Sequence, residues 1–139
     1  MSYTSVQTSE AVLGSDQTTV GAGELNALST TLTNPQNPGR AFVTACCTLK
    51  AGAPVAGDTF DVRLYKDATI ICTETIKVPD TTPRIAVALA ASVAIANSGT
   101  QTFSLRLIRT GGTGTLAVDA GGGANRSKIA WIIVPGATT

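Results

Sequence analysis

Histidine is absent from this 139-residue sequence, and aromatic residues make up only 4% of it. Without an imidazole, the Ser-His-Asp triad, histidine-based metal sites and imidazole acid–base catalysis are all excluded. Nucleic-acid binding by base stacking needs aromatic side chains among basic ones, and few are present here. We therefore predict a protein that is not an enzyme, that has no catalytic, cofactor-binding or metal-binding residues, and that binds no nucleic acid or small-molecule substrate.

A strong net charge and long apolar runs are also missing. The formal net charge is +1, which creates no long-range field to attract nucleic acid or an anionic membrane. Arg106, Arg109, Arg126 and Lys128 are interpreted as a solvated or intersubunit face on the C-terminal strands. No apolar stretch approaches the roughly 20 residues of a membrane span, and residues 1–10 do not resemble a signal peptide. We predict no membrane partner.

Cysteine is rare, and its number is odd. An odd number of cysteines fits a disulfide framework poorly, and this sequence has three, Cys46, Cys47 and Cys72. Cys46 and Cys47 are adjacent in a strand-like run, so their side chains should point to opposite faces, which disfavours a zinc site. We interpret all three as small buried hydrophobic residues and expect the protein to mature in a reducing cytoplasm.

Acidic pairs and glycine-rich loops offer no catalytic pattern. Asp58 and Asp61 are three residues apart, which places them on opposite faces of a strand. They are interpreted as a solvated strand entry rather than as an acid–base pair. The glycine runs at 111–114 and 121–123 lack the order Gly-x-x-x-x-Gly-Lys-Ser/Thr that binds phosphate, so they are predicted to be ordinary loops.

What the sequence does contain favours β-strands. It has 22 Thr, 20 Ala and 14 Gly against only 10 basic and 9 acidic residues; threonine favours pleated surfaces and glycine punctuates turns. Apolar and polar residues alternate, with the period of a strand, over residues 41–50, 60–65 and 103–107. In residues 129–134 larger side chains recur at every second position, but both faces are apolar. Residues 84–96 are rich in alanine, which favours a helix, but their larger apolar residues recur with period 2 and predict one long or two broken strands.

About eight strands at short spacing predict one all-β domain, an antiparallel β-sandwich or a barrel. Residues 18–20 are predicted to form a short strand, and residues 24–32 an irregular connection. Several strands are apolar on both faces, so a second sheet or another subunit must cover part of their surface. The predicted core comprises Val43, Phe60, Val62, Leu64, Val87, Leu89, Phe103, Leu105, Leu107, Leu116 and Trp131.

The first 17 residues are polar and hold Val6, Val12 and Leu13 as isolated apolar side chains. This pattern indicates an extended arm or a first edge strand. We predict an N-terminal arm over residues 1–17, followed by the sandwich domain over residues 18–139. Ordering each residue costs about 1–2 kcal/mol of backbone entropy, so an arm with three scattered aliphatic side chains is expected to order only on a partner.

Four segments resemble the small jelly rolls of tailed-bacteriophage virion proteins and of the related tumour-necrosis-factor-like trimers. They are residues 38–44 (PGRAFVT), 57–65 (GDTFDVRLY), 98–107 (SGTQTFSLRL) and 126–134 (RSKIAWIIV). The resemblance covers residues 18–134 and implies a jelly-roll-like sandwich without catalytic residues. It further implies a head decoration (cement) protein on the exterior of a phage capsid, which bridges capsid subunits and has the major capsid protein as its partner.

Two expectations about assembly and function accompany this resemblance. Strands that are apolar on both faces, together with the resemblance, predict a homotrimer. The alternative function is a receptor- or carbohydrate-binding module of a phage tail or fibre. Sugar sites usually display exposed aromatic residues, whereas Trp131, Tyr3, Tyr65 and the three phenylalanines mostly fall in core patterns.

Overall fold

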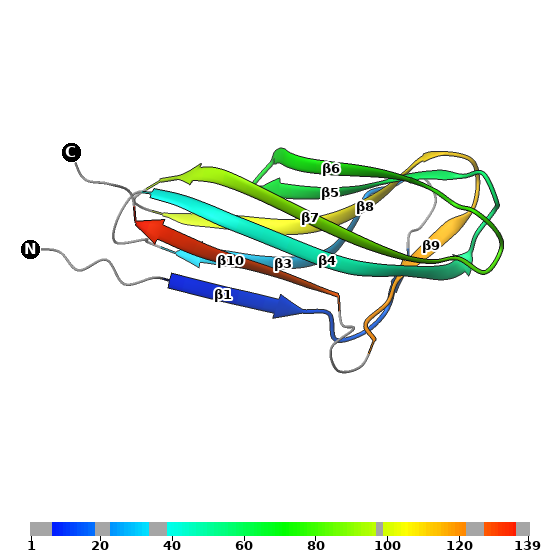
Figure 1. The fold of residues 1–139 in the computed structure, drawn as a ribbon, viewed down its shortest axis with the longest axis horizontal. Helices are drawn as coiled ribbons and strands as arrows, with labels where there is room; N and C mark the ends of the chain where they lie inside the picture. The colour runs from blue at the N-terminus through cyan, green and yellow to red at the C-terminus, as the bar shows by residue number, and fades with distance from the viewer. Residues whose placement is uncertain (1–6, 19–22, 34–38, 97–98, 122–126, 136–139) are drawn as a thin grey trace, which may run out of the picture.

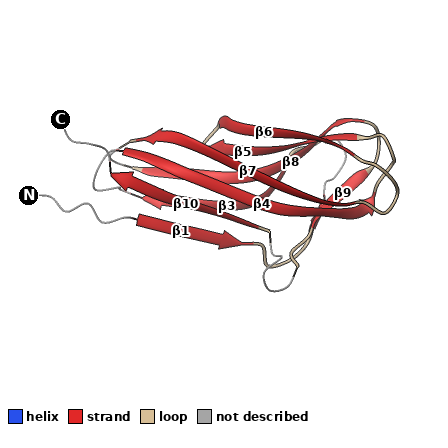
Figure 2. Cartoon of the chain, viewed as in Figure 1, coloured by secondary structure: helices blue, strands red, loops and turns tan. Residues whose placement is uncertain are grey.

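Ten β-strands, and no helix, make up the part of the chain that the structure describes. The computed structural model describes residues 7–18, 23–33, 39–96, 99–121 and 127–135 (Figures 1 and 2). In chain order the strands are β1 (Gln7–Val12), β2 (Gln17–Thr18), β3 (Leu25–Thr33), β4 (Gly39–Ala53), β5 (Thr59–Lys66), β6 (Thr69–Lys77), β7 (Arg84–Ile95), β8 (Thr100–Gly111), β9 (Thr115–Val118) and β10 (Lys128–Pro135).

The strands form two antiparallel sheets that pack face to face (Figure 1). In sheet A, β4 pairs with β7 along one side, and with β10 and then β9 along the other side; β1 pairs with β10, and β2 with β9. Sheet B has the order β3-β8-β5-β6. The chain crosses repeatedly between the sheets, so that most paired strands are distant in sequence, as in a jelly roll. The predicted all-β, jelly-roll-like antiparallel sandwich is confirmed.

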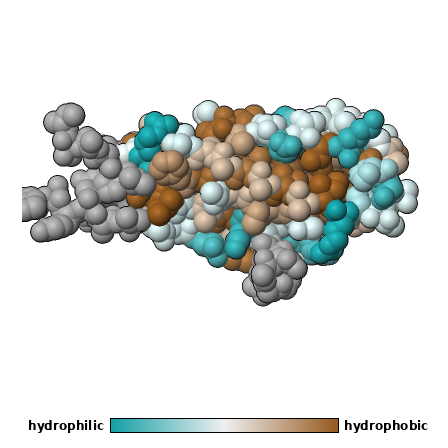
Figure 3. Space-filling view, in the orientation of Figure 1, coloured by the Kyte–Doolittle hydropathy of each residue, from teal (hydrophilic) through white to brown (hydrophobic). Residues whose placement is uncertain are grey.

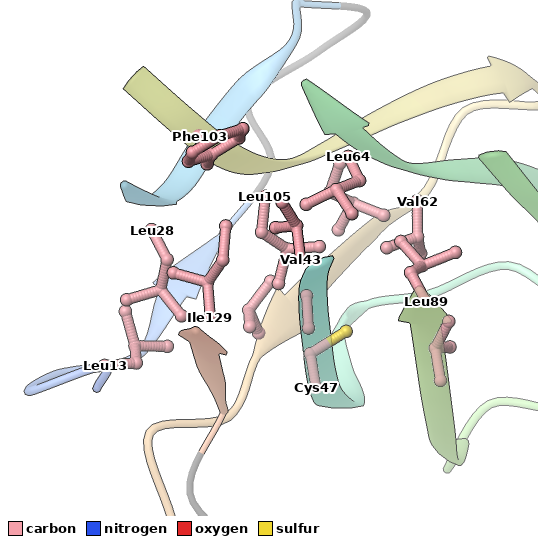
Figure 4. Close-up of a cluster of buried hydrophobic side chains, with 14 of the residues drawn as sticks. Leu13, Leu28, Val43, Cys47, Val62, Leu64, Leu89, Phe103, Leu105 and Ile129 are labelled. Carbon is pink, nitrogen blue, oxygen red and sulfur yellow. The ribbon is translucent and has the colours of Figure 1, made fainter. Parts of the chain in front are cut away.

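The core fills the space between the sheets and comes from alternate residues of each strand. Phe60 and Phe103 of sheet B are fully enclosed. Leucines and Phe103 from sheet B approach Val43 and Ile129 of sheet A (Figure 4). All eleven residues of the predicted core are buried, because the alternation in the sequence identified which face of each strand points inward.

Residues 84–95 form the single strand β7, which pairs with β4 over twelve consecutive positions without a bulge. Its inward residues include Val87 and Leu89, and four of its alanines, Ala86, Ala88, Ala90 and Ala94, lie on the opposite face. The period-2 pattern therefore predicted this element correctly, against the helical propensity of alanine. Burial of one face decides the conformation here, since intrinsic propensity is the weaker effect.

The N-terminal segment differs from the predicted arm. β1 pairs with β10 at all six of its positions, and the Leu13 side chain is 4% exposed within the core. The Leu13 amide donates a hydrogen bond of 2.9 Å to the Ser127 carbonyl. Residues 7–12 and 17–18 are thus strands of sheet A, which agrees with the first edge strand that the sequence left open beside the arm. Six backbone pairs and one buried leucine offset the ordering cost that the prediction treated as decisive. Residues 1–6 lie outside the described residues.

Candidate interaction surface

The outer face of sheet A carries mostly small and apolar side chains. Side chains alternate across a strand, so every second residue of β1, β10, β4 and β7 points away from the core. In the space-filling view, apolar residues form a band across this face (Figure 3). The outward apolar residues of the band are Phe42, Cys46, Ala86, Ala88, Ala90, Ala94, Ala130 and Ile132, and the small polar residues Thr44 and Ser92 lie among them.

A shallow hollow lies in the middle of this face. It has a volume of about 500 Å³ and its lining includes Cys46, Ala88, Ala90 and Ala130. A second hollow of about 300 Å³ adjoins it and shares Ala130 among its lining residues. The hollow exists because alanines stand where larger side chains would fill the space. A partner's side chains or backbone can therefore approach this part of the sheet closely.

Two large apolar side chains stand beside the hollow. Phe42 is 44% exposed and Ile132 is 39% exposed, and the two occupy paired positions on β4 and β10. A single exposed apolar side chain needs no explanation, but a contiguous apolar area on a polar protein is typical of an interaction site. Phe42 and Ile132 therefore extend the apolar hollow into one continuous surface, which we call the sheet A face.

Two opposite charges, Glu10 and Lys128, border the hollow. They lie on the adjacent strands β1 and β10. Neither makes an ion pair with another residue of the described ranges. By contrast, Arg40 at one end of the face donates hydrogen bonds to the side chain and carbonyl of Ser92, at 2.8 and 3.1 Å. The sheet A face thus combines apolar area with two charges available to a partner.

Charged residues at the far end of sheet A are paired internally. Lys50 lies 2.5 Å from Asp16 and 3.4 Å from Asp119, and Arg84 lies 3.1 Å from Asp119. The backbone amide of Gly121, followed by Lys50 and Arg84, lowers the pKa of Asp119 below its usual value. This cluster joins four segments of sheet A and leaves little uncompensated charge at that end.

The outer face of sheet B has the opposite character. Glu24 accepts hydrogen bonds from Tyr65 at 2.7 Å, from Arg106 at 3.0 Å and from Arg63 at 3.4 Å. The Arg106 guanidinium stacks over the Tyr65 ring at 4.1 Å, and Arg63 also pairs with Asp61 at 3.0 Å. The charged groups of Glu24, Asp61, Arg63 and Arg106 are therefore largely engaged with one another.

The Glu24 network predicts a pH-dependent contribution to stability. Partial burial raises the pKa of Glu24, but hydrogen bonds from Tyr65, Arg106 and Arg63 outweigh it and lower that pKa below 4.5. The contribution is therefore complete above pH 4.5 and is lost as pH falls through the lowered pKa. Glu24→Gln is expected to reduce the free energy of unfolding by about 1 kcal/mol at pH 7. Urea denaturation should show this difference shrinking below pH 4.5.

The control for this test is Glu74→Gln on β6. Glu74 is exposed and makes no ion pair within the described ranges. Its replacement is expected to change stability by less than about 0.5 kcal/mol at any pH. An equal, pH-independent loss in both variants would contradict the role given to Glu24.

The three cysteines occupy different environments. Cys47 is buried in the core, whereas Cys46 and Cys72 are half-buried, so the prediction of three buried cysteines holds fully only for Cys47. Cys46 and Cys47 point to opposite faces of β4, as expected. Within the described residues there is no cluster of three or more metal-ligating side chains and no helix long and apolar enough to cross a membrane.

The prediction that Asp58 lies at a solvated strand entry is wrong. Its side chain is 5% exposed and accepts hydrogen bonds from the amides of Gly114 at 2.5 Å and Thr113 at 3.2 Å. Gly112 has a φ of +90°, and a Cβ there would overlap the Asp58 carboxylate. The glycine run at 111–114 thus folds over Asp58, and the role of this carboxylate is to hold the loop between β8 and β9.

The solvated or intersubunit face predicted for Arg106, Arg109, Arg126 and Lys128 does not form one surface among the described residues. Arg106 and Arg109 lie on β8 in sheet B, whereas Lys128 lies on β10 in sheet A. Arg106 is engaged with Glu24, and Arg109 donates to the Gly114 carbonyl at 2.9 Å. Arg126 lies outside the described residues. The residues were grouped by sequence proximity, but the jelly-roll connection sends the two segments to opposite sheets.

Aromatic side chains are almost all withdrawn from the surface. Among the described residues, Phe42 is exposed, Tyr65 lies under Arg106, and Trp131 is buried with Phe60 and Phe103. This agrees with the expectation that most aromatics belong to the core. Tyr3 lies outside the described residues. The sequence predicted that several strands are apolar on both faces, but it did not identify the outer face of sheet A as the candidate site.

No family model and no curated protein matches this sequence. Solved structures do share its fold. A structure of infectious bursal disease virus, Gt strain, superposes with a TM-score of 0.54 at 9% identity over 92% of this chain and 33% of that chain. Dimeric latent PorU from Porphyromonas gingivalis superposes with a TM-score of 0.56 at 9% identity over 92% of this chain and 12% of that chain.

A native family 35 carbohydrate-binding module from Clostridium thermocellum aligns over 88% of this chain and 97% of that chain, at 12% identity and a TM-score of 0.42. That score is too low to carry an argument. The chain spans a third or less of the two structures that superpose better. At such low identity these similarities show a shared β-sandwich fold and leave the function to be argued from the surface.

Proposed function

We propose that this chain is a non-enzymatic structural protein of a bacteriophage virion. It decorates the exterior of the head and stabilises it by bridging subunits of the major capsid protein. The observation that carries the proposal is the sheet A face, an apolar surface on a jelly roll whose opposite face carries the paired charges of Glu24, Arg63 and Arg106. Such an asymmetry favours one-sided attachment to a protein surface.

The chemistry of the sheet A face fits a protein shell. Small side chains such as Ala88 and Ala90 permit close approach, and Phe42 supplies an anchor of the kind that dominates protein interfaces. Glu10 and Lys128 provide opposite charges that orient the contact without requiring a strongly charged partner. A protein that contacts two neighbouring capsid subunits at once gains avidity, so each single contact can be of modest affinity.

The location of the protein on the particle is the direct test. Heads of the phage that encodes this chain, purified after deletion of its gene, are mixed with the purified protein and imaged by cryo-electron microscopy. We expect density at regular positions across joints between capsid subunits, and increased resistance of the heads to heat. Density confined to the tail, or no density at saturating protein, would overturn the proposal.

A charge within the hollow is expected to prevent attachment. Thr44 is exposed on the sheet A face, so Thr44→Lys places a charged, hydrated ammonium group where apolar contact is required. Cosedimentation with the same heads should show binding weakened by about tenfold or more. The matched control is Thr31→Lys, which adds the same charge to exposed Thr31 on the outer side of β3 in sheet B. Equal loss in both variants would contradict a role for the sheet A face.

Recognition of a carbohydrate is the second candidate function, and Phe42 favours it. This exposed aromatic ring lines the smaller hollow together with the polar side chains of Thr8 and Glu10. An aromatic platform beside polar groups is a common arrangement in small-ligand sites. A glycan array distinguishes the two functions, because specific binding that is lost in Phe42→Ala supports the carbohydrate site.

A further inference from the structure

The free edge of β7 lacks the features that normally prevent a strand from pairing with another chain. β7 has twelve residues and, in the described part of the chain, pairs only with β4. Residues 85–95, IAVALAASVAI, contain no charged residue, proline or glycine. The β4–β7 ladder has no bulge. Natural proteins protect exposed edges with charge, proline, bulges or short length, and β7 uses none of these beyond Arg84 at its first position.

The other edge strands of the sandwich are protected. β1 carries Glu10, and β2, which continues the same edge, has two residues. β3 is irregular between Asn26 and Leu28 where it pairs with β8. β6 carries Glu74 and Lys77, and its pairing with β5 also contains a register shift. The absence of protection is therefore specific to β7.

We propose that the β7 edge is a self-association site, at which β7 pairs antiparallel with β7 of a second copy of this chain about a twofold axis. Antiparallel pairing of one strand with itself is isologous, since residue i contacts j and j contacts i. It satisfies the edge amide and carbonyl groups of both copies and joins the two A sheets into one continuous sheet.

The β7 edge is complementary to itself, which favours a second copy of this chain as its partner. Inward residues must lie opposite inward residues, because a shift of one position exchanges the two faces of a strand. A register centred on Ala90 meets this condition and pairs all eleven uncharged residues from 85 to 95. Across the joint, Val87 then lies opposite Val93, and Ile85 opposite Ile95, so that each inward pair is apolar.

Partial burial and charge support the same register. Ile85 and Val93 pack against the core but remain half-buried at the edge, so a second β7 would complete their coverage. Arg84 is already paired with Asp119. The register places the two copies of Arg84 at opposite ends of the joint, where they do not repel each other.

This joint adds a second surface to the one used in the proposed function and does not depend on it. The sheet A faces of the two copies become neighbours in one broad sheet, so a dimer presents two hollows to its partner. A twofold joint gives an even number of copies, in contrast to the homotrimer expected from the sequence. The mass of the purified protein alone, measured without any capsid, distinguishes these assemblies.

The test measures that mass by light scattering over a series of concentrations. The wild-type protein is expected to approach twice the monomer mass as concentration rises. Ala90→Lys places like charges opposite each other at the twofold axis and should weaken the dimer by about fivefold or more. Mixing Ala90→Lys with Ala90→Glu should restore a dimer that contains one copy of each variant.

Thr31→Lys, on the β3 edge of sheet B, is the charge control and should dimerise like the wild type. Circular dichroism of each variant confirms that the sandwich is intact. A strictly monomeric or trimeric mass for the wild type would overturn the proposal, as would an Ala90→Lys dimer of undiminished affinity. Failure of capsid attachment with an intact dimer would refute only the proposed function.

Discussion

Deleting residues 1–13 is expected to destabilise the protein by more than about 3 kcal/mol, because the deletion removes a buried leucine and a complete edge strand. Truncation of a buried leucine side chain alone typically costs about 2–5 kcal/mol, and Leu13 is 4% exposed. Loss of β1 also removes the strand that covers one edge of β10 over six positions, while β10 stays paired with β4 on its other side. It further removes the hydrogen bond of 3.2 Å between Ser9 and Thr30, which joins the two sheets at their edge.

Urea denaturation, followed by tryptophan fluorescence of Trp131 and by circular dichroism, measures this loss. Deletion of residues 1–6 is the matched control, since it leaves every described strand in place. We expect the longer deletion to lower the denaturation midpoint strongly and the shorter one to have little effect. An unchanged midpoint after the longer deletion would support the arm that the sequence indicated.

Asp58→Ala is expected to reduce the free energy of unfolding by about 2–4 kcal/mol. The buried Asp58 carboxylate satisfies two backbone amides, those of Thr113 and Gly114, and an unsatisfied buried donor costs about 1–3 kcal/mol. The loop also closes over this carboxylate, so the substitution leaves a cavity beneath it. Thermal unfolding monitored by calorimetry should show a clearly lowered midpoint.

Asp80→Ala provides the comparison for Asp58→Ala. Asp80 accepts a hydrogen bond of 2.8 Å from the Thr82 amide, but the site is exposed, so water replaces the lost acceptor. Its substitution should cost less than about 1 kcal/mol. Similar losses in the two variants would show that burial of Asp58 is not the source of its effect.

Strands with strict alternation could be predicted from the sequence. Residues 60–65 and 103–107 place apolar side chains at every second position, so their inward faces were assigned correctly. The irregular connection predicted over 24–32 was wrong, because β3 occupies residues 25–33. Its register shift near Ala27 interrupts the alternation, and the strand is recognisable only from its pairing with β8.

Features that depend on distant residues could not be predicted. Nothing in the sequence around Asp58 shows that the backbone amides of Thr113 and Gly114, 55 and 56 positions later, donate hydrogen bonds to it. Leu13 looked isolated because the core that receives it comes from other strands. The sequence indicated the sheet A face only through strands that are apolar on both faces. The topology of the two sheets determines which of those faces remains uncovered.

The three thiols form a natural set of footprinting probes. Burial raises the pKa of Cys47 to about 12, so this thiol is expected to resist alkylation while the protein is folded. Cys46 lines the hollow of sheet A, and Cys72 lies on β6 in sheet B. The alkylation rate of Cys46 relative to Cys72 therefore reports whether the hollow is covered, and any labelling of Cys47 reports unfolding. Mass spectrometry can measure alkylation at all three positions in the wild-type protein on an intact particle, without any substitution.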